Sequence, residues 1–247
     1  MKLAILTDLH GNREAVQACM DQAAALGAQR FVFIGDYVGY GADPAWVVET
    51  VREQVARGAI AVQGNHDLAA VQGPPPSMEP AATASALWTH EQLNASQRGF
   101  LAALPLTAKL GECLFVHANA VAPNEWGYVR SRADAMHSLE ATDQRLSFCG
   151  HVHEPRLYHL SSTAKLLDFE PVPGVAVPLL PTRRWLVLPG SAGQPRDGNP
   201  AVCWALFDTE TLDLSFQRVP YDHDAAAAKV IAAGLPPALA ERLRTGI

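Results

Sequence analysis

Three short apolar runs, each followed at once by polar or charged side chains, constrain this sequence more than any other feature. The runs end at Asp8, Asp36 and Asn65, and helical patterns separate them, from about Asn12 to Leu26 and from Pro44 to Arg57. Right-handed βαβ crossovers make such strands parallel and bring their carboxyl ends to one edge of the sheet. Open α/β sheets bind their ligands at that edge. The sequence therefore predicts a parallel sheet with a functional site where these strands end.

The second half of the chain contains a further set of strand-like segments. A helical pattern from Met78 to Ala103 precedes them. The expected strands are Leu106–Leu110, Cys113–His117, Leu146–Cys149, Arg156–Leu160, Lys165–Phe169, Arg184–Leu188, Ala201–Phe207 and Leu212–Val219. The last two are expected to form a hairpin, and the segment from Asp222 to Arg244 is expected to be helical. We therefore expect one α/β domain over residues 1–247, with a helical insert around 78–103. It would be a four-layer αββα sandwich, in which helices flank two mixed β-sheets.

Four of the nine histidines lie at or just past the end of a predicted strand, the position that Asp8, Asp36 and Asn65 also occupy. The seven side chains expected to converge are Asp8, His10, Asp36, Asn65, His117, His151 and His153. Seven ligands are too many for one tetrahedral ion. They suit two divalent ions that share a carboxylate, such as the pairs that bind both oxygens of a phosphoryl displacement. Mixed oxygen and imidazole ligands without thiolate favour Mn, Fe, Zn, Co or Ni.

Charge and composition exclude several classes of function. The net charge of −6 argues against binding of nucleic-acid polymers, which requires basic patches. The apolar start of the chain is too short for a signal peptide, and no segment is long enough to cross a membrane. The four cysteines form no Cys-x-x-Cys pair and lie in apolar segments, as expected for reduced thiols in a cytoplasmic protein.

Five motifs in a fixed order resemble the calcineurin-like metallophosphoesterase superfamily. They are Asp8-x-His10, Gly35-Asp36, Gly64-Asn65-His66-Asp67, His117 and Gly150-His151-x-His153. The segment from Leu188 to Asp197 resembles one in the small bacterial phosphodiesterase and nucleotide hydrolase members. Each motif alone is weak, but all five in this order and spacing are specific. The resemblance implies a metal-dependent phosphoric ester hydrolase.

The resemblance also implies a role for each site residue. One ion would be held by Asp8, His10 and His153, and the other by Asn65, His117 and His151, with Asp36 as the bridge. A hydroxide held between the ions would attack phosphorus, and His66 would protonate the leaving oxygen. On an extended backbone the side chains of Asn65 and His66 leave in opposite directions, so His66 is expected not to bind metal.

Departures from the family pattern narrow the expected substrate. The protein-phosphatase branch has an aspartate and an arginine where this chain has Gly39 and Tyr40. We therefore expect a small phosphodiester, nucleotide or dinucleoside polyphosphate as substrate. The alternatives are a phosphoprotein (Ser/Thr) phosphatase and a non-catalytic protein-binding scaffold, which should have lost ligands. The departure leaves open which group orients His66.

Three further residues are candidate substrate contacts, namely Asn12, Tyr40 and Arg196, although each is as readily explained as a turn or surface residue. Trp126 and Tyr128 follow a predicted ligand and could overhang the site. An aromatic side chain there could stack on a base or pack in the core. The sequence does not specify the oligomeric state.

Overall fold

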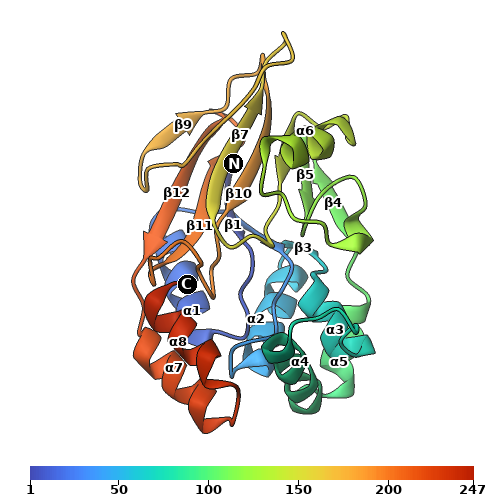
Figure 1. Cartoon of the computed structure of the whole chain (residues 1–247). Helices are drawn as coiled ribbons and strands as arrows, with labels where there is room; N and C mark the ends of the chain where they lie inside the picture. Colours follow the sequence, from blue (N-terminus) through green and yellow to red (C-terminus); the bar gives the residue numbers. More distant parts are fainter.

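The computed structural model describes residues 1–247 and contains two six-stranded sheets packed face to face, with helices on their outer faces (Figure 1). The first sheet has the order β3 (Ile60–Val62), β2 (Arg30–Ile34), β1 (Lys2–Leu6), β11 (Val202–Asp208), β12 (Asp213–Val219) and β9 (Ala176–Pro178). The second has the order β4 (Thr107–Leu110), β5 (Cys113–Val116), β6 (Leu146–Phe148), β10 (Arg184–Pro189), β7 (Pro155–Leu160) and β8 (Leu166–Phe169). This arrangement confirms the expected αββα layers.

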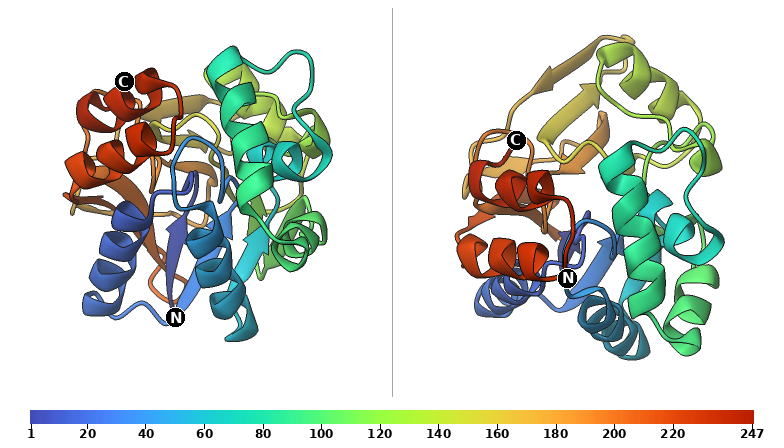
Figure 2. Two further views of the ribbon diagram at one scale, coloured as in Figure 1. Left: turned by 90° about the horizontal axis from the view of Figure 1, so that it is seen from below. Right: turned by 60° about the horizontal axis from the view of Figure 1, so that its bottom comes forward.

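Helices cover both sheets and surround one end of the molecule. They are α1 (Arg13–Ala25), α2 (Pro44–Ala56), α3 (Asn65–Gln72), α4 (Pro80–Gln92), α5 (Ala95–Ala102), α6 (Arg132–Glu140), α7 (His223–Ala232) and α8 (Pro237–Thr245), with a 3₁₀ turn at Pro123–Glu125. Helix α6 packs on the second sheet, whereas α1 and α2 pack on the first. Figure 2 shows α7 and α8 beside α1, and the group of α3, α4 and α5 on the other side of α2. None of the helices is long and apolar enough to span a bilayer.

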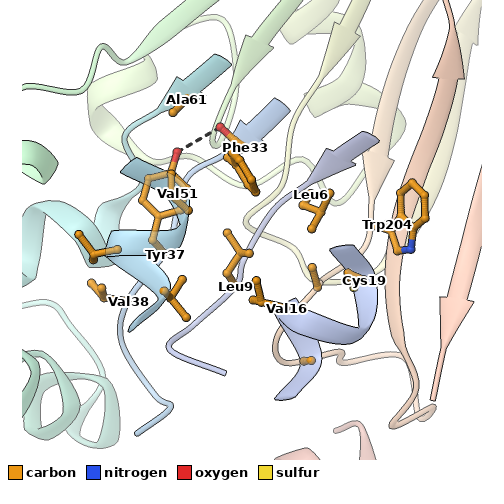
Figure 3. Close-up of a cluster of buried hydrophobic side chains, with 14 of the residues drawn as sticks. Leu6, Leu9, Val16, Cys19, Phe33, Tyr37, Val38, Val51, Ala61 and Trp204 are labelled. Carbon is orange, nitrogen blue, oxygen red and sulfur yellow. Dashed lines mark hydrogen bonds between the residues drawn. The ribbon is translucent and has the colours of Figure 1, made fainter. Parts of the chain in front are cut away.

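Strand β1 shows why its sequence is a continuous apolar run. Leu3 and Ile5 belong to the cluster of buried side chains between the two sheets. Ala4 and Leu6 point to the other face, where they pack with residues of α1 such as Val16 (Figure 3). A strand that is buried on both faces needs apolar side chains at every position, and this pattern is typical of strands covered on both sides.

The strand pairing agrees with the predicted topology. Strands β1, β2 and β3 are parallel neighbours, so the polar residues that follow them lie at one edge. Strand β11 pairs with β1 in the antiparallel sense, which makes the sheet mixed. Strands β11 and β12 form the expected hairpin. The second sheet is also mixed, because β6 is parallel to β5 and β10 while β7 is antiparallel to β10.

Some elements differ from the expectation. The single helix expected over 78–103 is two helices, because Asn94 caps α5 by accepting a hydrogen bond from the amide of Gln97. Helix α6 was not predicted, although Ser131 and Asp134 form a capping box that marks its start. Strand β9 exists only through its pairing with β12. The cysteines are free and buried, as predicted.

Candidate functional site

All seven predicted ligands meet at one end of the interface between the two sheets. Each follows a strand, and both sheets contribute. Asp8 and His10 follow β1, Asp36 follows β2, Asn65 follows β3, His117 follows β5, and His151 and His153 follow β6. Six of them are buried, with exposed fractions between 0% and 6%, and Asn65 is half-buried. The convergence predicted from strand ends is therefore present in the fold.

The first group of ligand atoms consists of Asp8, His10 and His153. His153 Nε2 lies 3.3 Å from Asp8 Oδ1 and 3.1 Å from His10 Nε2. The ligand atoms of these three side chains lie within 4.8 Å of one another. One carboxylate and two imidazoles at such distances can hold a divalent ion.

The second group consists of Asp36, His117 and His151, with Asn65 at its side. His117 Nε2 lies 3.3 Å from Asp36 Oδ2 and 3.2 Å from His151 Nδ1. The amide oxygen of Asn65 lies 3.2 Å from the same His117 nitrogen. The ligand atoms of Asp36, His117 and His151 also lie within 4.8 Å of one another, so the group offers a second position for an ion.

Asp36 lies between the two groups. Its Oδ2 atom is 3.3 Å from His117 Nε2 in the second group and 3.8 Å from His10 Nε2 in the first. The atom is buried and accepts no hydrogen bond within the protein. A buried carboxylate oxygen without a donor is costly unless a cation or donor satisfies it. A cation at either group, or one at each, satisfies this oxygen, and the donor set therefore fits a dinuclear site.

Backbone carbonyl groups orient three of the histidines. The Nδ1 atoms of His10, His117 and His153 lie within hydrogen-bond distance of carbonyl oxygens, at 3.1, 2.8 and 2.6 Å. The acceptors are Val38, Ile34 and Gln194 respectively. An imidazole that donates its Nδ1–H to a carbonyl has its Nε2 lone pair free for a metal ion. In all three residues the free Nε2 points into the site.

The charges of the site call for cations. Burial favours the neutral acid of Asp8 and Asp36, but neighbouring histidines outweigh burial and hold the pKa of both carboxyl groups below the ordinary value. Burial also disfavours the imidazolium form of His117, but Asp36 and Asp8 outweigh it and raise the pKa of His117 to about 10. The raised pKa of His117 shows that the two buried carboxylates favour positive charge in this site, such as a proton on this histidine. Divalent ions would replace that proton.

The backbone at the site is unusual. Five of the seven predicted ligands have left-handed φ angles: Asp8 (54°), His10 (48°), Asp36 (55°), His151 (69°) and His153 (66°). Such a conformation costs about 1–3 kcal/mol for a residue other than glycine and persists only where the surrounding structure imposes it. The strands thus turn sharply at their ends, which brings side chains from both sheets onto the same small volume.

His66 lies beside the ligands but is not part of either group. Asn65 and His66 lie in the first turn of α3, so the extended backbone expected for them is wrong. Their side chains still diverge, because the ring of His66 packs 4.5 Å from that of Tyr40 and 5.0 Å from that of His10. The Nδ1 atom of His66 is buried and has no hydrogen-bond partner. Packing, and not a carboxylate, therefore orients this ring.

The surroundings of Gly39 explain why this position holds a glycine and not the orienting acid of the protein-phosphatase branch. A Cβ atom placed on Gly39 would lie 2.6 Å from Nδ1 of His66, and the glycine has a φ angle of +84°. A side chain at position 39 would thus collide with the imidazole, in addition to the strain of the left-handed backbone. The space that an orienting acid would need is occupied by His66 itself.

Asp67 holds the loop that carries Asp36, a role that no sequence pattern indicates. One carboxylate oxygen accepts hydrogen bonds from the amides of Asp36 and Gly64, each 2.9 Å long. The other accepts from the amides of Tyr37 and Val38, at 2.8 and 3.3 Å. These bonds join the end of β2 to the start of α3. Asp67 therefore fixes the position of Asp36 without facing the ligand groups.

The three candidate substrate contacts differ in their surroundings. Asn12 is 2% exposed, its amide nitrogen donates to Gly193 O and to the Tyr221 hydroxyl, and its oxygen caps α1. Asn12 thus has a structural role in this structure, which favours the turn-residue explanation of this position. Arg196 is half-buried, its Nε has no hydrogen-bond partner, and its guanidinium lies 5.6 Å from the ring of Tyr40. Arg196 and Tyr40 remain candidates.

The segment after His117 covers the second group with aromatic side chains. The ring of Tyr128 stacks on that of His151, with 4.0 Å between centroids, and the guanidinium of Arg130 lies 4.0 Å from the other face of Tyr128. Trp126 approaches His117 at 6.0 Å in an edge arrangement. The overhang expected for this segment is therefore present.

Comparisons with known proteins agree with this geometry. Residues 1–212 match the profile of the calcineurin-like phosphoesterase superfamily domain. An uncharacterised protein of Methanocaldococcus jannaschii is 31% identical over 250 residues, covering 99% of this chain and 98% of its own length. The crystal structure of a metallophosphoesterase from Sphaerobacter thermophilus superposes with a TM-score of 0.88 and 32% identity, over 100% of this chain and 99% of the other. A hypothetical protein of Pyrococcus horikoshii gives a TM-score of 0.78 at 20% identity, over 100% and 98% of the chains.

Proposed function

The chain belongs to the calcineurin-like phosphoesterase superfamily and is a metal-dependent phosphoric ester hydrolase, and we propose that it acts on a small phosphodiester, nucleotide or dinucleoside polyphosphate. The observation that carries the proposal is the position of Asp36 Oδ2 between His10 and His117. Two groups of ligands that share one carboxylate suit a pair of divalent ions, and such pairs serve in-line displacement at phosphorus.

We assign the ligands as two sets with one bridge. Asp8, His10 and His153 would hold one ion, and Asn65, His117 and His151 the other, with Asp36 between them. Manganese is one of the ions that these oxygen and imidazole ligands suit, together with iron, zinc, cobalt and nickel. When bound, such ions supply Lewis acidity and lower the pKa of a coordinated water molecule.

Two other side chains would donate a proton to the leaving group and bind the phosphoryl group. The ring of His66 lies against Tyr40 and His10, beside the first ligand group and outside both sets of ligands. From there it would donate a proton to the oxygen that leaves phosphorus. Burial lowers the pKa of His66, which makes its imidazolium form a stronger acid. Arg196, whose guanidinium has an unpartnered Nε, would bind a phosphoryl oxygen beside Tyr40.

A phosphoprotein phosphatase is a weaker assignment. In that branch an acid orients the histidine and an arginine binds phosphate, whereas this chain has Gly39 and Tyr40 at those positions. A scaffold without catalysis is weaker still, because all seven ligands and His66 are present. The reduced, buried cysteines support a cytoplasmic location.

A substrate screen tests the proposal. The metal-loaded protein is incubated with phosphomonoesters, phosphodiesters, dinucleoside polyphosphates and phosphopeptides, and the initial rates are compared. We expect diesters or polyphosphate anhydrides to be hydrolysed faster than any phosphopeptide. Faster hydrolysis of phosphoserine peptides than of every diester and nucleotide would overturn the proposed substrate class.

A further inference from the structure

Two hollows with different sets of charged side chains lie beside the ligand groups. The larger, of about 570 Å³, extends from His66 and His151 along the start of α3 to the loop before α4 and the segment around Trp126. Its charged side chains, apart from histidine, are the exposed carboxylates Glu79 and Glu125, and no lysine or arginine lines it. Neither carboxylate forms an ion pair within the protein. We call this hollow the acidic cavity.

The second hollow, of about 380 Å³, lies on the side of His153. It is lined by three arginines, namely Arg130, Arg156 and Arg196, and by three carboxylates, namely Glu154, Glu170 and Asp197. Arg156 pairs with Asp168, but Arg130 and Arg196 have no carboxylate partner within 4.0 Å. Asp197 pairs with Arg218, whereas Glu154 and Glu170 form no ion pair, so the unpaired charges of this second hollow, the mixed-charge cavity, balance one another.

We propose that the group leaving phosphorus is an uncharged alcohol that occupies the acidic cavity. The proposal rests on the proposed function, and in particular on His66 as proton donor. A proton donor must lie within about 3 Å of the oxygen that it protonates. Because His66 lines the acidic cavity, the leaving group must extend into that cavity.

The charge of the acidic cavity decides which leaving group fits. A leaving group with its own phosphates, as in a dinucleoside polyphosphate, would bring negative charge beside Glu79 and Glu125, where no lysine or arginine lines the cavity. Like charges placed together are unfavourable and select against the wrong ligand. A nucleoside or another neutral alcohol carries no such penalty. The inference thus favours a phosphodiester or nucleotide ester over a dinucleoside polyphosphate.

One aromatic side chain of the acidic cavity suits a planar leaving group. Both faces of Tyr128 are covered, by His151 and by Arg130, and Tyr40 is 7% exposed. Trp126 lines the cavity, is half-buried, and meets His117 in an edge arrangement and not by stacking. A base or aryl ring can stack on the indole while its alcohol oxygen faces His66.

The test compares two leaving groups that differ in charge. Methyl 4-nitrophenyl phosphate and its 3-carboxy-4-nitrophenyl analogue share the retained methyl phosphate and release nitrophenolates of similar basicity. We expect kcat/KM of the metal-loaded enzyme to be about tenfold lower for the carboxylated ester, because a like charge is added beside two carboxylates. Dinucleoside monophosphates should likewise be hydrolysed faster than dinucleoside tetraphosphates.

A charge-reversal variant and a matched control make the test specific. Glu125→Lys should raise kcat/KM for the carboxylated ester about tenfold relative to the neutral ester. Glu140→Lys makes the same charge change at an exposed site on α6, outside both cavities, and should leave the ratio unchanged. A preference for the carboxylated ester or for dinucleoside tetraphosphates, or an equal shift in both variants, overturns this inference alone. No hydrolysis of any ester by the metal-loaded protein overturns the proposed function and this inference with it.

Discussion

The backbone amide of Asp36 donates a 2.9 Å hydrogen bond to the carboxylate of Asp67, which lies in α3, after the neighbouring strand β3. The carboxylate of Asp36 in turn accepts a 2.9 Å hydrogen bond from the amide of His66. The segments after β2 and β3 are thus bonded to each other in both directions. The position of the proposed bridging ligand depends on a residue that faces away from the ligand groups.

Asp67→Asn should destabilise the protein and weaken its binding of metal. The amide NH₂ would face two backbone N–H groups in place of an acceptor oxygen, and those buried donors would lose their partner. We expect the free energy of unfolding to fall by about 1–3 kcal/mol. Urea titration of the metal-free variant measures this loss, and elemental analysis measures the metal retained after dialysis.

Asp134→Asn is the matched control for that substitution. Asp134 also accepts hydrogen bonds from backbone amides, at Arg130 and Ser131, but it is only half-buried, at the start of a surface helix. We expect a loss of no more than about 1 kcal/mol, since a helix cap at the surface contributes that much. Equal losses of unfolding free energy in the two variants would mean that the buried hydrogen bonds of Asp67 contribute no more than a surface helix cap.

Asp36→Asn should damage both proposed metal positions at once. Its Oδ2 atom lies 3.3 Å from His117 Nε2 and 3.8 Å from His10 Nε2, so a change of charge there affects both groups. We expect fewer than one ion per chain by elemental analysis, and loss of hydrolysis. Asp8→Asn should spare the second group and retain about one ion. If Asp36→Asn kept two ions and full activity, the bridging assignment would be wrong.

Removal of metal should abolish activity and lower stability together. The buried carboxylates and histidines of both sheets surround the proposed ions, so an ion binds the folded chain far better than the unfolded one. At a free concentration one hundred times the dissociation constant, each ion contributes about 2.7 kcal/mol. Calorimetry with and without a chelator should show a lower unfolding temperature after chelation, and readdition of metal should restore it. An unchanged unfolding temperature would contradict the proposed binding at the sheet interface.

Gly39→Ala should reduce turnover without removing metal. The added Cβ would lie 2.6 Å from Nδ1 of His66, so the ring must move from its position. We expect the loss of turnover to approach that of His66→Asn, with metal content unchanged. Gly58→Ala is the control, because Gly58 also has a left-handed φ, +100°, yet nothing lies within 4 Å of its added Cβ. Similar activity losses in both variants would show that backbone strain alone, and not contact with His66, is responsible.

His66→Asn should separate proton transfer from metal binding. A general acid contributes roughly 10²–10⁴-fold in rate, and most where the leaving group is a poor one. Alkyl or nucleoside esters should therefore lose far more turnover than nitrophenyl esters, while elemental analysis finds both ions. Equal losses on the two ester types would indicate that His66 stabilises charge and does not donate the proton. Loss of an ion would show that His66 is a ligand.

The sequence was sufficient to bring the seven proposed metal ligands together, because each of them follows the end of a strand. A strand buried on both faces, such as β1, is apolar throughout, so the first charged residue after it marks its end. Parallel pairing then places Asp8 and Asp36 side by side. The same logic extends to His117 and His151, which follow the neighbouring strands β5 and β6.

Other features required coordinates because they depend on contacts distant in sequence. Helix α3 begins directly after β3 and has eight residues, too few for a clear apolar period. The structural role of Asn12 is one of these features, because its amide bonds to Gly193 and Tyr221, about two hundred residues along the chain. No pattern of residues indicates that Gly39 lies against the ring of His66.

His153 can be oriented only after Gln194 has been synthesised, because the carbonyl group of Gln194 accepts from the Nδ1 position of His153. Strand β11, which follows it, pairs with β1 at the other end of the chain. A nascent chain still held by the ribosome therefore lacks an oriented His153 and one neighbour of its first strand until almost the whole sequence has emerged. Domains generally fold as units during synthesis. The ion proposed at Asp8, His10 and His153 would then be acquired only after the chain has been synthesised beyond Gln194, from the metals that are available at that time.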